Sequence, residues 1–202
     1  QPGTYYENII WPATNGIKLI GSGEDDCIID GNQEASVIRF EVYLGNIIDS
    51  TTIINGFTIK NGHAQGNGLN KKGGGIFCYN SNPSLENLII TDNSSNDDGG
   101  GIFNVGNMRL VNVTIKNNHA TYYGGGLFCS SSNPTLINVT INGNSASMGG
   151  GIYSTACDQS LTNVIISYNS GSYGAGIFYR QSDANLSNVT INNNYGHGIH
   201  CY

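Results

Sequence analysis

Charged side chains are scarce in this chain. Asp, Glu, Lys and Arg make up 11% of the residues, whereas a soluble domain usually carries about a quarter. The formal net charge is -6 and the eight Lys and Arg are scattered, so the basic footprint that nucleic acid requires is missing. No apolar run approaches the roughly 20 residues of a membrane span. We therefore expect neither a nucleic-acid partner nor a membrane span.

Metal-ligating patterns are also missing. No CxxC or HExxH spacing occurs, and Glu24-Asp25-Asp26 lacks the ordered ligand spacing of a calcium loop, which indicates an acidic turn. The chain has five Cys, an odd number that excludes a complete internal disulfide framework. We expect no metal and no cofactor.

What the sequence does contain is a repeat built on glycine. A Gly triplet followed by an aliphatic and usually an aromatic residue begins at Gly73, and from Ile76 to the next such aliphatic residue, Ile102, is 26 residues. The next three steps are 25 residues each. The copies are 73–77, 99–103, 124–128, 149–153 and 174–178, with a degenerate copy at 196–200.

A second motif keeps step with the first. It reads Asn, two alternating aliphatic positions, then Asn again, as in Asn138-Val139-Thr140-Ile141 followed by Asn144. The other copies begin at Asn87, Asn112, Asn163 and Asn188. The alternation has period two, which is typical of a strand. Asn at the corners is expected to form ladders, and Gly permits tight bends.

A unit of about 25 residues with two or three short strands predicts one coil of a solenoid, because it is too short for a propeller blade. We expect an all-β, right-handed parallel β-helix of about seven to eight coils, in one domain spanning 1–202. Residues 1–72 form irregular coils and residues 73–202 form regular 25-residue repeats.

The alternation also assigns faces. The aliphatic residue after each Gly triplet hardly varies in kind, so it is expected to point inward, together with Val139 and Ile141. The aromatic residue beside it then points outward. This stripe is the predicted binding or assembly surface, although turns or a terminal segment could also cover it; its members are Phe77, Phe103, Phe128, Tyr153 and Phe178.

These residues resemble the repeats of right-handed parallel β-helix surface proteins. The Gly-Gly-Gly-Ile and Ile-x-x-Asn units are similar to the GGA[ILV] and FxxN motifs of chlamydial polymorphic outer-membrane proteins, with Ile here where that family has Phe. The opening 2–9 is similar to the first coil of many pectate-lyase-like proteins. The resemblance covers nearly the whole chain. It implies the fold, and this fold hosts lyases, hydrolases, tailspikes, adhesins and structural proteins alike.

Other candidate chemistry is weak. Asp97-Asp98 and His119, close to Tyr122-Tyr123, are a possible small site, but a solvated turn is the favoured interpretation. An outward Thr column is interrupted by Ile89 and Ile165, which disfavours ice binding. Sequons occur at Asn93, Asn112, Asn138, Asn185 and Asn188; three of them (Asn112, Asn138 and Asn188) are expected in an inward ladder, as by-products of the repeat.

The cysteines follow the repeat. Cys78, Cys129 and Cys201 fall at one repeat position, where they resemble small buried apolar residues. Cys78 and Cys129 are two coils apart, beyond disulfide reach, so no disulfide is expected along this column. Cys27 and Cys157 remain open to pairing between molecules.

The two ends of the sequence are in phase. Eight residues after Cys78 comes Glu86-Asn87-Leu88; if residue 1 of a second molecule followed Tyr202, Glu7-Asn8-Ile9 would come eight residues after Cys201. This predicts head-to-tail stacking with the chain itself as partner, although two ends trimmed from a longer β-helix would look the same. The end-to-end contact is expected at Thr4, Tyr5, Tyr6, Glu7, Asn8, Ile9, Ile199, His200, Cys201 and Tyr202.

The leading hypothesis is an extracellular structural protein, at the cell surface or beyond it, that self-assembles into a filament or surface layer and has no catalytic residues. Two alternatives stay open. One is a glycan-binding adhesin or the passenger region of a surface protein, with a cell-surface or matrix polysaccharide as partner. The other is a polysaccharide lyase or glycoside hydrolase.

Overall fold

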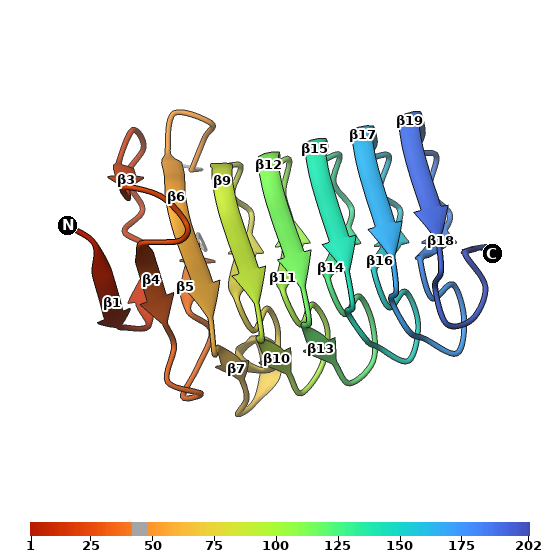
Figure 1. Ribbon diagram of the computed structural model, residues 1–202, viewed down its shortest axis with the longest axis horizontal. Helices are drawn as coiled ribbons and strands as arrows, with labels where there is room; N and C mark the ends of the chain where they lie inside the picture. Colours follow the sequence, from red (N-terminus) through yellow and green to blue (C-terminus); the bar gives the residue numbers. More distant parts are fainter. Residues whose placement is uncertain (42–47) are drawn as a thin grey trace.

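The computed structural model describes residues 1–41 and 48–202. The chain winds into a parallel β-solenoid of about eight turns with about 25 residues per turn, and successive coils lie side by side along the long axis (Figure 1). This confirms the fold class expected from the repeat. No helix among these residues is long and apolar enough to cross a membrane.

Three parallel sheets run along the solenoid, one for each side of the coil. The long-strand sheet consists of β1 (Gly3–Tyr6), β4 (Cys27–Asp30), β6 (Ile53–Lys60), β9 (Ser84–Thr91), β12 (Arg109–Lys116), β15 (Thr135–Asn142), β17 (Ser160–Ser167) and β19 (Asn185–Asn192), with β3 (Lys18–Ile20) pairing with β6. The short-strand sheet consists of β2 (Ile9–Ile10), β5 (Ile38–Glu41), β8 (Ile76–Tyr79), β11 (Ile102–Val105), β14 (Leu127–Ser130), β16 (Ile152–Thr155), β18 (Ile177–Arg180) and β20 (Ile199–Cys201).

The remaining elements are a third, shorter sheet and one short helix. β7 (His63–Ala64), β10 (Ser94–Ser95) and β13 (His119–Ala120) form the third sheet, and isolated bridges at Ser145, Ser170 and Tyr195 continue it. A 3-10 helix, η1 (Gly68–Lys71), lies in the loop before β8.

The registers confirm the faces assigned from the sequence. Each residue pairs with its counterpart one repeat away, as Ile152 does with Leu127 and Ile177. The core that fills the solenoid contains Ile76, Cys78, Val139 and Ile141, as expected. Because every coil buries the same positions, the core continues through the molecule.

Two ladders of asparagine side chains bend the chain, one just after the ends of the long strands and one in the middle of them. The inner asparagine ladder is largely buried and comprises Asn93, Asn118, Asn144, Asn169 and Asn194. The outer asparagine ladder lies within the long-strand sheet and comprises Asn87, Asn112, Asn138, Asn163 and Asn188. Its members have a left-handed backbone conformation, with φ between 49° and 55°.

The outer asparagine ladder corrects one expectation. Asn112, Asn138 and Asn188 were expected to point inward, but all three are exposed. An isolated residue with positive φ bends the strand and swings its side chain out of the alternation. Sequence patterning treated the two asparagine columns as equivalent because both recur with the same period.

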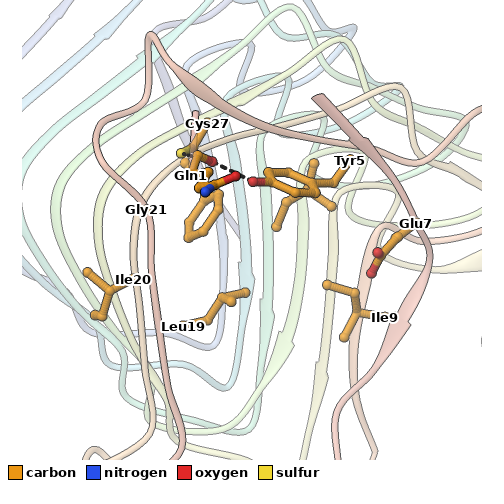
Figure 2. A pocket seen from close by; sticks show the side chains of 10 residues that line it. Gln1, Tyr5, Glu7, Ile9, Leu19, Ile20, Gly21 and Cys27 are labelled. Carbon is orange, nitrogen blue, oxygen red and sulfur yellow. Dashed lines mark hydrogen bonds between the residues drawn. The ribbon is translucent and has the colours of Figure 1, made fainter. Parts of the chain in front are cut away.

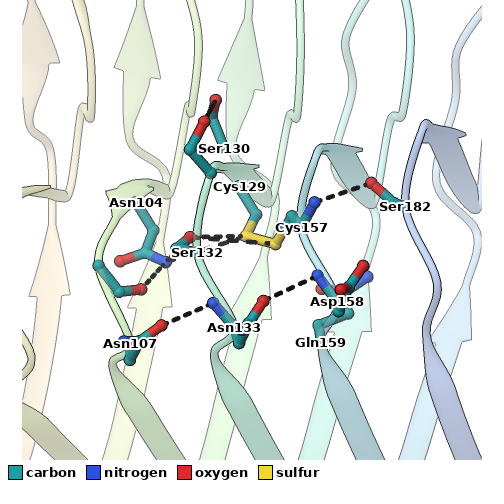
Figure 3. Close-up of a disulfide and its surroundings, with 12 residues drawn as sticks. Asn104, Asn107, Cys129, Ser130, Ser132, Asn133, Cys157, Asp158, Gln159 and Ser182 are labelled. Carbon is teal, nitrogen blue, oxygen red and sulfur yellow. Dashed lines mark hydrogen bonds between the residues drawn. A yellow bond between two sulfur atoms is a disulfide. The ribbon is translucent and has the colours of Figure 1, made fainter.

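No disulfide joins Cys78, Cys129 and Cys201 to one another, as expected, but Cys157, which was left open to pairing between molecules, is bonded within the chain. Cys129, in β14, is bonded to Cys157, in the turn after β16, with 6.3 Å between their Cα atoms (Figure 3). The turn after β16 brings Cys157 beside Cys129 of the adjacent coil, so the disulfide links two neighbouring coils covalently. The expectation considered only cysteines at the shared repeat position, and Cys157 lies outside that position.

The register of the N-terminal coil is also different from the expected one. Ile9 pairs with Ile38, which pairs with Ile76. Ile9 therefore occupies the position after the Gly triplet. The match between the chain ends required it to occupy the position of Leu88 instead. The gap-free phasing is wrong because the chain turns a corner at Asn8, whose amide bonds the carbonyl oxygens of Gly31 and Ser36. The opening segment therefore forms two strands, β1 and β2, on two different sheets.

Candidate functional site

The aromatic stripe predicted from the sequence forms a continuous stack on the outer face of the short-strand sheet. Neighbouring ring centroids from Phe77 to Phe178 are 4.9 to 5.6 Å apart, and the planes are within 4° of parallel. His200 extends the stack at 4.9 Å from Phe178, and the guanidinium of Arg39 covers Phe77 at 4.0 Å. We call Phe77, Phe103, Phe128, Tyr153 and Phe178 the aromatic ladder.

The aromatic ladder lies outside the main core, as expected, but it is not an open surface. Its side chains are only 0 to 7% exposed and form a hydrophobic cluster of their own. The expectation of an exposed binding stripe is therefore wrong, and cover by neighbouring turns, the alternative weighed above, is correct. Stacking uses the ring faces, so only ring edges are left to contact other groups.

A second column of residues covers the aromatic ladder. It consists of the residue immediately before each Gly triplet, namely Lys72, Asp98, Tyr123, Met148 and Tyr173. Tyr123 stacks on Tyr153 with centroids 4.6 Å apart, and Tyr173 contacts His200 edge-on at 5.7 Å. Leu69 from η1 packs on the ladder as well. Burial raises the pKa of the Tyr153 hydroxyl.

The first two members of this covering column form a charged cluster. Lys72 Nζ contacts Oδ2 of Asp98 and lies 3.3 Å from Oδ2 of Asp97. The same Nζ lies 5.2 Å from the ring centroid of Phe103 and 5.9 Å from that of Phe128. The favoured interpretation of Asp97-Asp98 as a solvated turn is wrong for Asp98, which is 5% exposed. Burial raises its carboxyl pKa to about 6.

The opposite end of the covering column leaves a cavity of about 520 Å³. Tyr123, Met148, Tyr153 and Tyr173 line one part of it. Arg180, His200 and Tyr202 line the rest. Such a mixture of aromatic rings with hydroxyl and guanidinium donors fits a sugar ring, which offers both apolar faces and hydroxyl groups.

The N-terminal end of the solenoid is hollow. A cavity of about 300 Å³ is lined by Tyr5, Ile9, Leu19 and Ile29 among others (Figure 2). The Cys27 thiol lies beside it, and hydrogen bonds to Ser22 lower its pKa. The predicted end-to-end residues therefore do lie at the two ends: Thr4, Tyr5, Tyr6, Glu7, Asn8 and Ile9 on the first strands, and Ile199, His200, Cys201 and Tyr202 on the last.

The charged cluster and the disulfide were not predicted as a site. Asp97-Asp98 was weighed as a small site with His119 and disfavoured against a solvated turn, and Lys72 was not among its expected members. The signal was their common position before the Gly triplet, which places them on adjacent coils. Among the described residues, no three His, Cys, Asp or Glu side chains lie together so as to hold a metal ion.

Comparison with known families gives one match. The family model of the Chlamydia polymorphic membrane protein repeat matches residues 87–105, 112–130 and 138–155. Each matched stretch begins at an outer-ladder Asn and ends at the last residue of a short strand, so it runs from the long-strand sheet through the third side of the coil to the short-strand sheet. No curated protein and no solved structure matches the chain. The chain is therefore a parallel β-helix repeat protein, and part of it is similar to the repeats of Chlamydia polymorphic membrane proteins.

Proposed function

We propose that this surface protein is a structural one that assembles head to tail through the two ends of its solenoid. The main support is that core side chains are exposed to solvent at the last coil. Leu186 and Ile199 are 45% and 44% exposed, whereas their counterparts one coil earlier, Leu161 and Ile177, are completely buried. The same side chains are thus apolar and buried inside the stack but uncovered at its end.

Unpaired strand edges accompany this apolar end. Within the described residues, β1 pairs only with β4, β19 only with β17, and β20 only with β18. An edge of this kind accepts another strand because its N–H and C=O groups lack partners. One end of a second copy supplies such strands in the same parallel direction.

The observed registers specify how two copies would meet. Successive pairings in the long-strand sheet make Val189 the counterpart of Gly3 at the other end of the solenoid. In the contact, Thr4 of one copy would therefore pair with Thr190 of the next, and Tyr5 with Ile191. Through the short-strand sheet, Ile9 stands in the column that ends at Ile199. The N-terminal cavity then receives apolar side chains from the neighbour. A contact between two different surfaces propagates along a line and does not close.

Electron microscopy of the purified chain tests this proposal. Filaments are expected with an axial repeat of about 40 Å, since about eight coils stack at about 4.8 Å. Leu186→Lys and Ile199→Lys should abolish them, because each places a charge in the contact. The matched control is Ile165→Lys: Ile165 is 48% exposed on the side of the solenoid, so filaments should persist. Dispersed particles from the unaltered chain would contradict the proposal.

A second candidate function is favoured by the cavity at Tyr173 and Arg180. This is glycan binding, in which a sugar stacks on Tyr173 and its polar groups bond Arg180. Titration calorimetry with acidic and neutral polysaccharides measures it. Tyr173→Ala should weaken binding about tenfold or more if stacking contributes on the order of 1.5 kcal/mol, while Tyr168→Ala, at an equally exposed tyrosine outside this cavity, should leave it unchanged.

A further inference from the structure

Lys72 and Asp98 hold equivalent positions on adjacent coils. Lys72 precedes Gly73 and Asp98 precedes Gly99, and the backbone N–H of Gly73 donates to the carbonyl oxygen of Asp98 at 3.0 Å. The two backbones are therefore held together independently of the side chains. The ammonium nitrogen of Lys72 lies directly against the carboxyl group of Asp98, and Asp97 approaches the same nitrogen from the side.

The surroundings of this pair disfavour separated charges. The side chains of Lys72 and Asp98 are 19% and 7% exposed, and the rings of Phe103 and Phe128 lie next to the nitrogen. Oδ1 of Asp98 is buried and finds no hydrogen-bond partner among the described residues. Burial of this kind favours the neutral form of a carboxylic acid over its ion, and it raises the pKa of Asp98 to about 6.

We propose that Lys72 and Asp98 are joined by an intramolecular isopeptide bond that the protein forms by itself, with Asp97 as the carboxylate that moves the protons. The three groups required are an amine, a carboxyl group and a second carboxylate, and all three are in contact here. The chemistry goes beyond the proposed assembly and does not depend on it.

The atoms of this reaction balance without any cofactor. A proton passes from the Lys72 ammonium to the Asp98 carboxylate, which leaves a neutral amine beside a neutral acid. Nζ then attacks Cγ of Asp98, a C–N bond forms, and Asp97 carries a proton from the nitrogen to the departing hydroxyl. One water molecule leaves, and an amide replaces the ion pair. No oxidation or reduction takes place.

Such a bond would clip the coil that contains Lys72 to the coil that contains Asp98. The disulfide between Cys129 and Cys157 clips two later coils in the same way. Unlike the disulfide, an amide resists reducing agents. It also converts a costly buried ion pair into a neutral group, which relieves the desolvation of both charges.

The chain contains a matched control for this chemistry. Lys60 Nζ lies 3.7 Å from Oδ2 of Asp30, its direct partner on the adjacent coil, but its side chain is 32% exposed. No second carboxylate forms an ion pair with Lys60 among the described residues. Because Lys60 is more exposed than Lys72 and has no third group beside it among the described residues, we expect this pair to remain an ordinary ion pair.

Peptide mapping by mass spectrometry of the purified chain, after reduction, tests the proposal. No Lys or Arg lies between Lys72 and Arg109. An amidated Lys72 blocks trypsin, so a peptide 72–109 lighter by one water should appear. Further cleavage after Glu86 should leave 72–86 joined to 87–109. The peptide that contains Lys60 should have its ordinary mass. Cyclisation of Gln1 also lowers the mass, by one ammonia, but this change lies in the N-terminal peptide and is therefore distinguished from the loss of water.

Two variants separate the bond from its catalysis. Lys72→Arg keeps the positive charge but cannot form the amide, so the peptides 87–109 and 73–86 should be unlinked. Asp97→Asn keeps the side-chain shape but cannot carry protons, and the linked fraction should fall at least tenfold. Ordinary cleavage after Lys72 in the unaltered, folded chain, with 73–109 at its full mass, would overturn the proposal. Complete linkage in Asp97→Asn would overturn the role of Asp97.

Discussion

The inner and outer asparagine ladders use the same residue at the same period but stabilise the fold in different ways. In the inner ladder, the Nδ2 of Asn144 donates to the carbonyl oxygen of Ile115 at 2.9 Å and to the Oδ1 of Asn169 at 3.0 Å. Its Oδ1 accepts from both the backbone N–H and the Nδ2 of Asn118. In the outer ladder, Asn138 makes one ladder bond each way, in contact with solvent.

The difference shows that burial, and not the hydrogen-bond count alone, sets the importance of a polar residue. An inner-ladder amide replaces water that cannot reach the corner, so its loss leaves buried groups without partners. An outer-ladder Asn is selected mainly for its backbone, because Asn tolerates the left-handed conformation better than most residues. The two ladders therefore predict unequal responses to substitution.

The largest effect is expected from the inner ladder. Asn144→Ala removes four hydrogen bonds at a side chain that is fully buried and leaves the backbone N–H of Asn118 without its acceptor. We expect the free energy of unfolding to fall by about 4 kcal/mol, as two or more buried groups lose their partners. Urea denaturation followed by circular dichroism measures it. If the unfolding free energy fell only as much as in an outer-ladder variant, the two ladders would not differ in their contribution to stability.

The second-largest loss of stability is expected from removal of the disulfide, which lies at the third corner of the coil. There a ladder of side-chain oxygens accepts backbone N–H groups, as Asn133 does from Asp158 at 3.1 Å (Figure 3). Cys157→Ser opens a link that spans 28 residues, and the unfolding free energy should drop by about 3 kcal/mol. Thermal melts with and without reductant compare the two chains; the variant should no longer respond to reductant. An unchanged response would mean that another pair is bonded.

A glycine beside the inner ladder gives a third, smaller effect. A Cβ on Gly126 would lie 2.7 Å from the carbonyl oxygen of Gly151 and 3.1 Å from Nδ2 of Asn144. Gly126→Ala must therefore push adjacent coils apart and should cost about 2 kcal/mol of stability. Gly68→Ala is a useful comparison, because a Cβ there meets no atom within 4 Å although φ is +59°. If the two variants were equally stable, close packing of the coils would not be the cause.

The smallest effect is expected in the outer ladder. Asn138 has φ 55°, so Asn138→Ala should lose about 1 kcal/mol through backbone strain. Asn138→Gly removes the same side chain but adopts this φ freely, and its loss should be only a few tenths of a kcal/mol. The difference between the two variants, measured by denaturant titration, isolates the conformational cost. Equal losses for the two variants would show that the exposed amide bonds, which both variants remove, dominate.

Much of the fold followed from the sequence because its signals are local and repeated. The Gly triplet and the alternation around Val139 and Ile141 recur in every regular coil, so each copy supports the assignment of the others. Phe77 and its counterparts were placed outside the core for the same reason. Burial of these rings could not be predicted, because it depends on Leu69 and on the covering column, which reach them only once the coils are stacked.

The sequence by itself determined the solenoid, its period, its inward-facing column and its class, since these depend on residue type and spacing along the chain. The tertiary structure decided which asparagine column is buried, that Cys157 meets Cys129, where Ile9 enters the first coil, and that Lys72 lies against Asp97 and Asp98. Each of these depends on how a turn folds back onto the neighbouring coil. Residues 25 or so apart in sequence then stand about 5 Å apart in space, and the turn, not the repeat, selects which of them touch.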